Sequence, residues 1–200
     1  MEFFKGESFL EESLALVKYE KLSTKDKLIM YFLIYSFLGW VLESFYAVLV
    51  LGHFVKRGFL FGPICPIYGF GAVIFILIFD GLKGHNIKKF FISMIVFSIF
   101  EFAASWILEM VFHLRWWDYS DAMFNIQGRI CLSFSIVWGL AGIIFSNYLH
   151  PFIEKKTEKL LKKIDFPIQR ATIYALASVL VVDFILSSIK YINFTSFIKI

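Results

Sequence analysis

The sequence predicts an all-α, polytopic membrane protein: a helical bundle with five transmembrane helices, two parallel helical-hairpin repeats and an N-terminal amphipathic helix. Composition is the first reason, because 59% of the 200 residues are hydrophobic and only 18% are charged. A soluble domain is about half apolar and a quarter charged. The second reason is that five separate apolar runs reach the roughly 20 residues that a membrane helix needs. The third is that two motifs of the first half recur in the second half at one constant spacing.

The apolar runs divide the chain into a short N-terminal segment and one transmembrane domain. Residues 1–27 form the predicted cytoplasmic segment, in which the apolar side chains of 8–20 recur at helical spacing. Residues 28–192 form the predicted membrane domain. Its parts are the helices 28–51 and 66–82 (repeat one, about 28–82), the helices 90–114 and 130–149 (repeat two, about 90–149), the amphipathic loop 150–170 and the fifth helix 171–189.

Lysine and arginine are distributed unevenly between the connections. The N-terminal segment and the second and fourth connections, which share one side of the membrane, hold 14 of them. The first and third connections and the residues after the fifth helix, on the opposite side, hold 6. Because positive charge gathers on the cytoplasmic side of a membrane, we expect a multi-pass protein of the cell membrane with a cytoplasmic N-terminus. The connections 52–65 and 115–129 then face outward. The lysine-rich stretch 152–164 is expected to bind anionic lipid, with docking of a cytoplasmic partner as the alternative. His150-Pro151 predicts that the fourth helix ends there.

The stretch 57–71, RGFLFGPICPIYGFG, is expected to form the wall of a site. It carries two prolines and four glycines between two apolar runs. Proline removes a backbone donor and glycine adds backbone freedom, so a continuous helix through this stretch is disfavoured. Irregular backbone survives beside a bilayer only where protein or a water-filled cavity covers its polar groups.

Two motifs support the internal repeat. WVLE at 40–43 recurs as WILE at 106–109, and GPIC at 62–65 recurs as GRIC at 128–131, both with an offset of 66 residues. The chain has only two cysteines, and both fall in this second pair. Cys65 and Cys131 are therefore expected at equivalent helix starts, either bonded to each other in an oxidising exterior or buried as free thiols.

Acidic residues inside the spans are the first candidates for a site. Glu43 and Glu101 lie near the middle of their helices, and Glu109 lies nearer the outer boundary. Ionisable side chains inside a membrane usually face the bundle interior and are paired or functional. Two interpretations remain open. In the first, Arg57 and Arg129 neutralise these acids and only stabilise the packing of the helices. In the second, the acids form a polar site that contacts a ligand, a proton or a cation.

The connection 115–129 supplies the second group of candidates. Trp117, Asp118, Tyr119, Asn125 and Arg129 bring aromatic rings and hydrogen-bonding groups together, as in many ligand sites. We expect a lid or recognition loop, although tryptophan and tyrosine are also common at membrane surfaces.

The sequence lacks the usual motifs of catalysis and cofactor binding. It has no GxxxxGK[ST] for nucleotide hydrolysis, no nucleophile elbow and no C-x-x-C. The lysines gather at helix ends rather than in a basic aromatic stripe, which argues against nucleic acid as a partner. We therefore expect no cofactor and no metal, and we favour a role other than that of an enzyme.

Six motifs together resemble the family described as "Putative ABC-transporter type IV", often labelled CmpB-like. They are FLGWVLE (37–43), RGFLFGPICPIYGFG (57–71), RWWDYSD (115–121), NIQGRICL (125–132), WGL (138–140) and HPF (150–152). The resemblance covers roughly residues 31–152. It implies a permease-type component whose ATPase is a separate chain, which agrees with the missing P-loop.

We interpret the chain as a permease-like subunit of an ABC-type transporter with an outward-facing polar substrate site. The site residues are expected to be Glu43, Arg57, Glu101, Glu109, Trp117, Asp118, Tyr119, Asn125 and Arg129. The expected partners are membrane lipid, a separate ATPase or other membrane subunits, and further copies of the same chain. One alternative is an intramembrane enzyme acting on a lipid or a cell-envelope precursor. The other is a non-transporting membrane scaffold or sensor.

Overall fold

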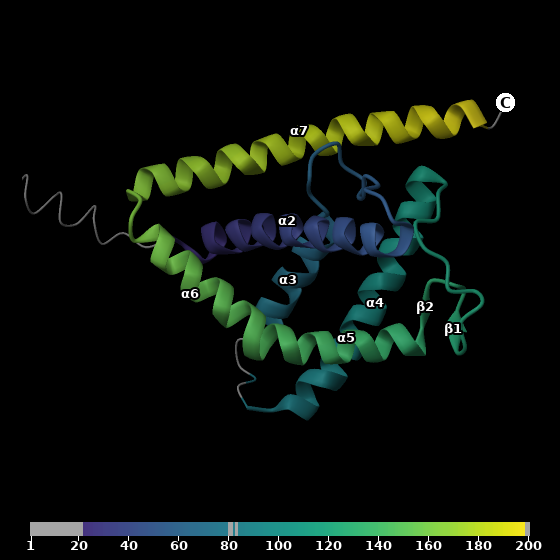
Figure 1. The fold of residues 1–200 in the computed structure, drawn as a ribbon, viewed down its shortest axis with the longest axis horizontal. Helices are drawn as coiled ribbons and strands as arrows, with labels where there is room; N and C mark the ends of the chain where they lie inside the picture. The colour runs from purple at the N-terminus through teal and green to yellow at the C-terminus, as the bar shows by residue number, and fades with distance from the viewer. Residues whose placement is uncertain (1–21, 80–81, 83, 199–200) are drawn as a thin grey trace, which may run out of the picture.

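The computed structural model describes residues 22–79, 82 and 84–198, with side chains up to residue 192. It is almost entirely helical (Figure 1). The elements are α2 (Thr24–Leu51), α3 (Pro66–Phe79), α4 (Asn86–Phe112), β1 (Asn125–Ile126), β2 (Ile130–Cys131), α5 (Leu132–Ile144), a π-helical turn η1 (Phe145–Leu149), α6 (His150–Leu161) and α7 (Phe166–Ile198). The predicted N-terminal amphipathic helix at 8–20 lies outside the described residues.

Within the described residues, four helical stretches are long and apolar enough to cross a membrane, so the chain is a membrane protein. They are Thr24–Leu51, Asn86–Phe112, Leu132–Leu161 and Phe166–Ile192. α3 differs from these because its 14 residues span about 21 Å, less than the roughly 30 Å of a bilayer's hydrocarbon core. The stretch expected as the second of five full spans is thus a short helix in the structure.

The chain enters α3 beside the middle of α2. The Cys65 amide donates a hydrogen bond of 2.9 Å to the carbonyl of Ser36, and Ser36 is the thirteenth of the 28 residues of α2. Residues 52–65 therefore leave the end of α2 and return along it in an irregular conformation. Of the glycines and prolines in the stretch 57–71, Gly58, Gly62 and Pro63 lie in this irregular segment, whereas Pro66, Gly69 and Gly71 lie in α3. The segment has positive φ at Gly52 and Gly58.

Small residues bring the helices of each hairpin close together. Gly39 of α2 lies against the ring of Tyr68, and Gly69 of α3 lies against the Ser36 hydroxyl. In the second hairpin, Gly142 of α5 packs on Ser93 of α4. A Cβ at any of these glycines would overlap its neighbour, so the close approach depends on glycine, as is usual between membrane helices.

Stacked aromatic rings join the two hairpins. The ring centroids of Phe75 and Phe97 lie 4.0 Å apart, and Phe145 lies 5.0 Å from Phe75 and 5.1 Å from Tyr35. These rings belong to α2, α3, α4 and η1, and they are buried. They form the centre of the main hydrophobic core.

The prediction that the fourth helix ends at His150-Pro151 was wrong. Helical structure continues from Leu132 to Leu161. The π-helical turn Phe145–Leu149 ends two residues before Pro151. Pro151 has no N–H to donate to the preceding turn, and a local widening of the helix accommodates it without a break. The predicted fourth span and much of the predicted amphipathic loop are therefore one helix, whose α6 part has no buried residue.

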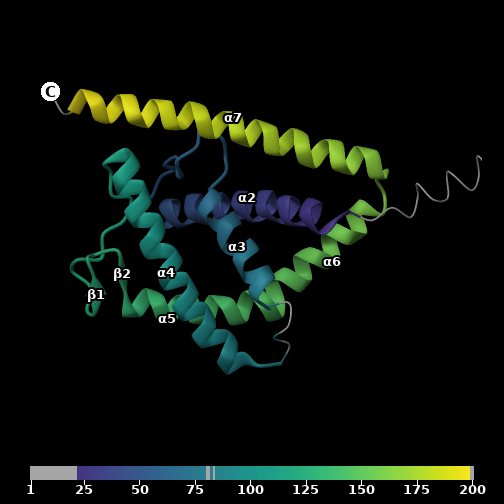
Figure 2. The ribbon, with the colours of Figure 1, turned by 180° about the vertical axis from the view of Figure 1, so that it is seen from behind.

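α7 lies along α2 (Figures 1 and 2) and is mostly exposed. At one end the Tyr174 hydroxyl donates a 2.8 Å hydrogen bond to Asp26 of α2. Further along, Asp183 bonds to the segment 52–65. The rest of α7 presents large apolar side chains on all sides, as expected for a helix whose neighbour is lipid. The β1–β2 hairpin lies at the end of the bundle where α2 ends (Figure 1).

Candidate functional site

Most of the predicted site residues lie in two groups of polar side chains. The first, which we call the acid–tyrosine centre, consists of Glu43, Glu101, Tyr68, Tyr119 and Trp138. The second, the loop ion cluster, consists of Arg115, Asp118 and Arg129 of the connection 113–131 and Glu109 near the end of α4. The two groups differ in the kind of partner that the carboxylates have.

Glu43 of α2 is held by α3. The Tyr68 hydroxyl donates a hydrogen bond of 2.5 Å to Glu43 Oε1. Tyr68 lies in the first turn of α3, and this turn lies beside the middle of α2 because residues 52–65 fold back. The irregular segment thus places a phenol next to an acid inside the membrane domain.

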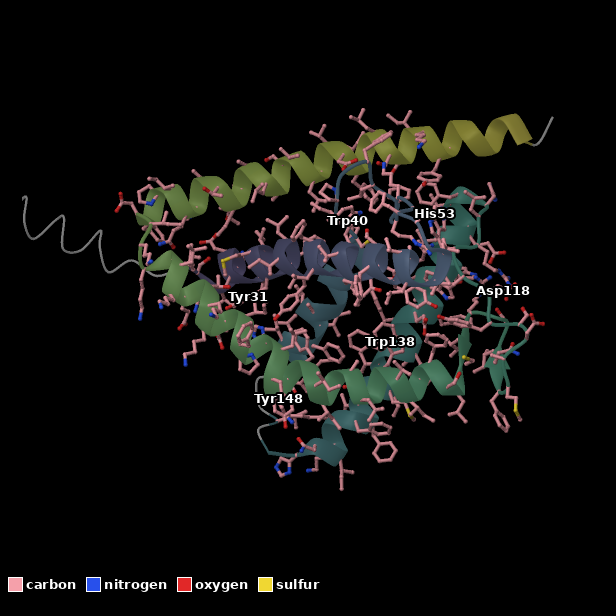
Figure 3. The ribbon with its side chains drawn as sticks, in the orientation of Figure 1. Tyr31, Trp40, His53, Asp118, Trp138 and Tyr148 are labelled. Atoms are coloured by element: carbon pink, nitrogen blue, oxygen red, sulfur yellow. The ribbon has the colours of Figure 1, made fainter. Side chains whose placement is uncertain are left out.

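Glu101 of α4 is held by two donors from different elements. The Tyr119 hydroxyl and the Trp138 Nε1–H each donate a hydrogen bond of 3.0 Å to its carboxylate. Glu101 is 6% exposed. Trp138 extends from α5 (Figure 3), whereas Tyr119 comes from the connection 113–131. The Tyr119 ring stacks on Phe134, with 4.6 Å between the centroids, which fixes the direction of its hydroxyl.

Glu101 and Glu43 both affect the pKa of Tyr119. Burial raises the pKa of Tyr119, and the negative charges of Glu101 and Glu43 raise it further. Tyr119 therefore stays protonated and remains a donor. Among the residues that the structure describes, neither Glu43 nor Glu101 forms an ion pair. The centre therefore holds carboxyl groups with neutral donors only, an arrangement that can accept a proton or a cation.

The loop ion cluster is paired internally. Arg129 is 8% exposed and lies 2.6 Å from Glu109 Oε2, and it also donates a 3.1 Å hydrogen bond to Ser105. Arg115 lies 3.4 Å from Glu109 and 3.6 Å from Asp118. Two guanidinium groups thus meet two carboxylates, and the cluster ties the connection to α4.

Most of the other predicted residues in this connection form hydrogen bonds within the connection and stabilise its conformation. Trp117 Nε1 donates to the Arg129 carbonyl at 3.0 Å. Asn125 donates to the carbonyls of Ser120 and Ala122. Hydrogen bonds from the Ser120 hydroxyl and amide lower the pKa of Asp118. Tyr119 is the residue of this connection whose side chain bonds to an acid of the acid–tyrosine centre.

The structure therefore divides the predicted site residues. Glu101 accepts a hydrogen bond from Tyr119, and Glu109 forms an ion pair with Arg129. Arg57 joins neither group by an ion pair within the described part of the chain, and its Nε is buried without a hydrogen-bond partner. Both cysteines are free and buried, each directly before a helix, α3 or α5.

Two residues of the acid–tyrosine centre were not singled out from the sequence, and the partner of Asp183 was not predicted. Tyr68 lies in the stretch 57–71 and Trp138 in the motif WGL, so their motifs were noted but their partners were not. Asp183 accepts hydrogen bonds from the amides of Phe61 at 2.9 Å and Gly62 at 2.7 Å. An acid in an apolar helix indicates a polar partner, but no local pattern says that the partner is backbone 121 residues away.

Asp183→Ala is expected to loosen the segment 52–65. The change removes the acceptor of the Gly62 amide and one of the two acceptors of the Phe61 amide, which also donates to Ser187 Oγ at 3.2 Å. A hydrogen bond to a charged group contributes about 1.5–3 kcal/mol. Hydrogen–deuterium exchange of the full chain in detergent should show faster exchange at Phe61 and Gly62 and unchanged exchange in α4. Ser178→Ala, at an exposed position of the same helix, is the control. Wild-type exchange at both amides in the aspartate variant would contradict the assignment.

A metal centre has no support in the described residues, where no three His, Cys, Asp or Glu side chains come together. The chemistry available in the acid–tyrosine centre is that of carboxyl, phenol and indole groups.

These features define a class: a polytopic helical membrane protein with a buried acidic centre and a folded connection over one end of its bundle. The family model described as "Putative ABC-transporter type IV" matches residues 30–188, and the chain belongs to this family. The comparisons with curated proteins and with solved structures gave no match. Membership in an ABC-transporter family indicates a membrane-associated assembly.

Proposed function

We propose that the chain is a permease-like subunit of an ABC-type transport system whose nucleotide hydrolysis is performed by a separate ATPase chain. Family membership supports the class. The sequence carries no GxxxxGK[ST] motif, so an ATP-driven cycle needs another subunit. Copies of this chain or other membrane subunits would complete the translocation path.

The acid–tyrosine centre is the proposed substrate site. The observation that carries this proposal is that Glu43 and Glu101 are bonded to Tyr68, Tyr119 and Trp138 rather than to arginine or lysine. An ionised acid inside a membrane is costly unless a positive charge or a proton compensates it. The centre is therefore suited to a proton or to the cationic group of a substrate.

The connection 113–131 is proposed to act as a lid on this site. Its Tyr119 hydroxyl bonds directly to Glu101. Its other end is fixed to α4 through Arg129 and Glu109. Lifting the connection would free one donor of Glu101 and expose the carboxylate, so opening of the lid and access to the site are coupled.

Alternating access is proposed to rock two related hairpins against each other. The hairpins are α2–α3 and α4–α5, and their second helices begin 66 residues apart, each directly after a cysteine. This offset matches the spacing of the repeated motifs. In the proposed orientation the N-terminus is cytoplasmic, as the lysine and arginine distribution predicts, and the lid faces outward.

Copurification tests the proposed class. The tagged full chain, extracted from its native membrane in mild detergent, is expected to carry a nucleotide-hydrolysing subunit and vanadate-sensitive ATP hydrolysis. A tagged membrane protein of another family, prepared in the same way, is the control. A preparation that retains its native membrane partners but contains no ATPase would contradict the proposal.

A further inference from the structure

A pocket outside the acid–tyrosine centre lies where the segment 52–65 passes between α2 and α7. Its volume is about 270 Å³. The pocket is lined by Trp40, Phe54, Lys56, Phe61, Gly62 and Pro63. Trp40 lies on the side of α2 that faces α7 (Figure 3). The pocket therefore has apolar walls and a positively charged group at its edge.

Two ammonium groups lie beside one wall of the pocket. Lys56 Nζ is 5.1 Å and Lys190 Nζ 5.0 Å from the ring centroid of Phe61. Lys56 belongs to the segment 52–65, whereas Lys190 belongs to α7. Neither lysine forms an ion pair in the part of the chain that the structure describes.

The pocket lining also contains an unpartnered donor. Trp40 Nε1 is buried and has no hydrogen-bond partner. Buried polar atoms normally have a partner, so this donor points to an acceptor that the protein does not supply. The nearby carboxylate of Asp183 does not serve it, because it accepts from the Phe61 and Gly62 amides.

We propose that this pocket binds a phosphate anion, supplied by the headgroup of an anionic phospholipid. Lysine ammonium and indole N–H groups are donors, and an ionised phosphate offers acceptors. Phe54, Phe61 and Pro63 cover the apolar part of the ligand next to the phosphate. The exposed apolar side chains of α2 and α7 that flank the pocket accommodate its acyl chains. This site is separate from the acid–tyrosine centre and does not depend on the transport function.

Photo-crosslinking of the full chain tests the proposal. The probes are phosphatidic acid and phosphatidylcholine, each with a diazirine near the top of one acyl chain, added to the protein in mixed micelles. Peptides that contain residues 54–63 and 183–192 are expected to be labelled by phosphatidic acid. Lys56→Gln/Lys190→Gln should reduce this label about tenfold or more, because it removes two charge-assisted contacts.

The control separates the pocket from general attraction of anionic lipid. Lys155→Gln/Lys156→Gln removes two exposed charges from α6 and should leave the label at 54–63 unchanged. Competition by inorganic phosphate would show that free phosphate also enters the pocket, and no competition would show that the lipid is required. Equal labelling by phosphatidylcholine, or full labelling of the Lys56/Lys190 variant, would overturn the proposal and leave these lysines as ordinary membrane-surface residues.

Discussion

Arg129→Ala is expected to lower the melting temperature of the detergent-purified chain by about 5–10 °C. Arg129 is nearly buried, and its removal leaves the Glu109 carboxylate and the Ser105 hydroxyl without their shortest partner. The connection 113–131 loses its main tie to α4. Limited proteolysis should therefore cut this connection sooner than in the wild type, and differential scanning fluorimetry gives the melting temperature.

Arg115→Ala is the matched control for this variant. Arg115 contacts the same Glu109 carboxylate at 3.4 Å, but a third of its side chain is exposed. An exposed ion pair contributes little to stability, so Arg115→Ala should shift the melting temperature by much less. In Glu109→Gln/Arg129→Ala the loss should be smaller than the sum of the two single losses, since the residues act as a pair. A melting temperature of Arg129→Ala equal to that of the wild type would refute the structural role.

Glu101→Gln and Glu43→Gln are each expected to weaken cation binding at the acid–tyrosine centre at least about thirtyfold, because a buried charge contact is lost. Glutamine keeps the shape and an acceptor oxygen for Tyr68, Tyr119 or Trp138, so the fold should persist. The probes are sodium, potassium and choline chloride. Binding is measured as thermal stabilisation of the full chain at constant ionic strength. Infrared difference spectroscopy follows protonation of the carboxyl groups as the pH changes.

Glu158→Gln, an exposed position on α6, is the control for both acids. It should leave the salt response and the carboxyl bands of the centre unchanged. If both acid variants fold and keep the wild-type salt response and the wild-type pH-dependent spectrum, the centre has only a structural role. That result would not change the expected copurification of an ATPase, so the proposed site and the proposed class of protein are tested separately.

The membrane class and the main helices could be predicted because they depend on local hydrophobicity. The runs at 28–51 and 90–114 correspond to α2 and α4 within a few residues. The predicted fifth helix, 171–189, lies inside the longer α7 (Phe166–Ile198). The predicted second helix, 66–82, begins with α3 at Pro66, and α3 is described as far as Phe79. One extent was wrong: the helix expected to stop at His150 continues to Leu161. There the backbone accommodates Pro151 after a π-helical turn, which hydropathy does not report.

Three residues of the acid–tyrosine centre, Glu43, Glu101 and Tyr119, are among the site residues expected from the sequence, but their pairings were not predicted. Glu43, Glu101, Glu109 and Arg129 all have buried or half-buried polar partners, as acids and bases in apolar helices require. The sequence left open whether arginine neutralises the central acids. In the structure Arg129 bonds to Glu109, and the central acids bond to tyrosine and tryptophan.

By itself the sequence determined that this protein lies in a membrane, that the glycine- and proline-containing segment before Pro66 interrupts its helices and that acids lie inside its spans, since these follow from composition and local backbone chemistry. Only the tertiary structure decided which groups the acids meet. Tyr68 lies 25 residues from Glu43, and Gly62 lies 121 residues from Asp183. Such contacts exist because residues 52–65 fold back between α2 and α7, a path set by packing across the bundle rather than by any local pattern.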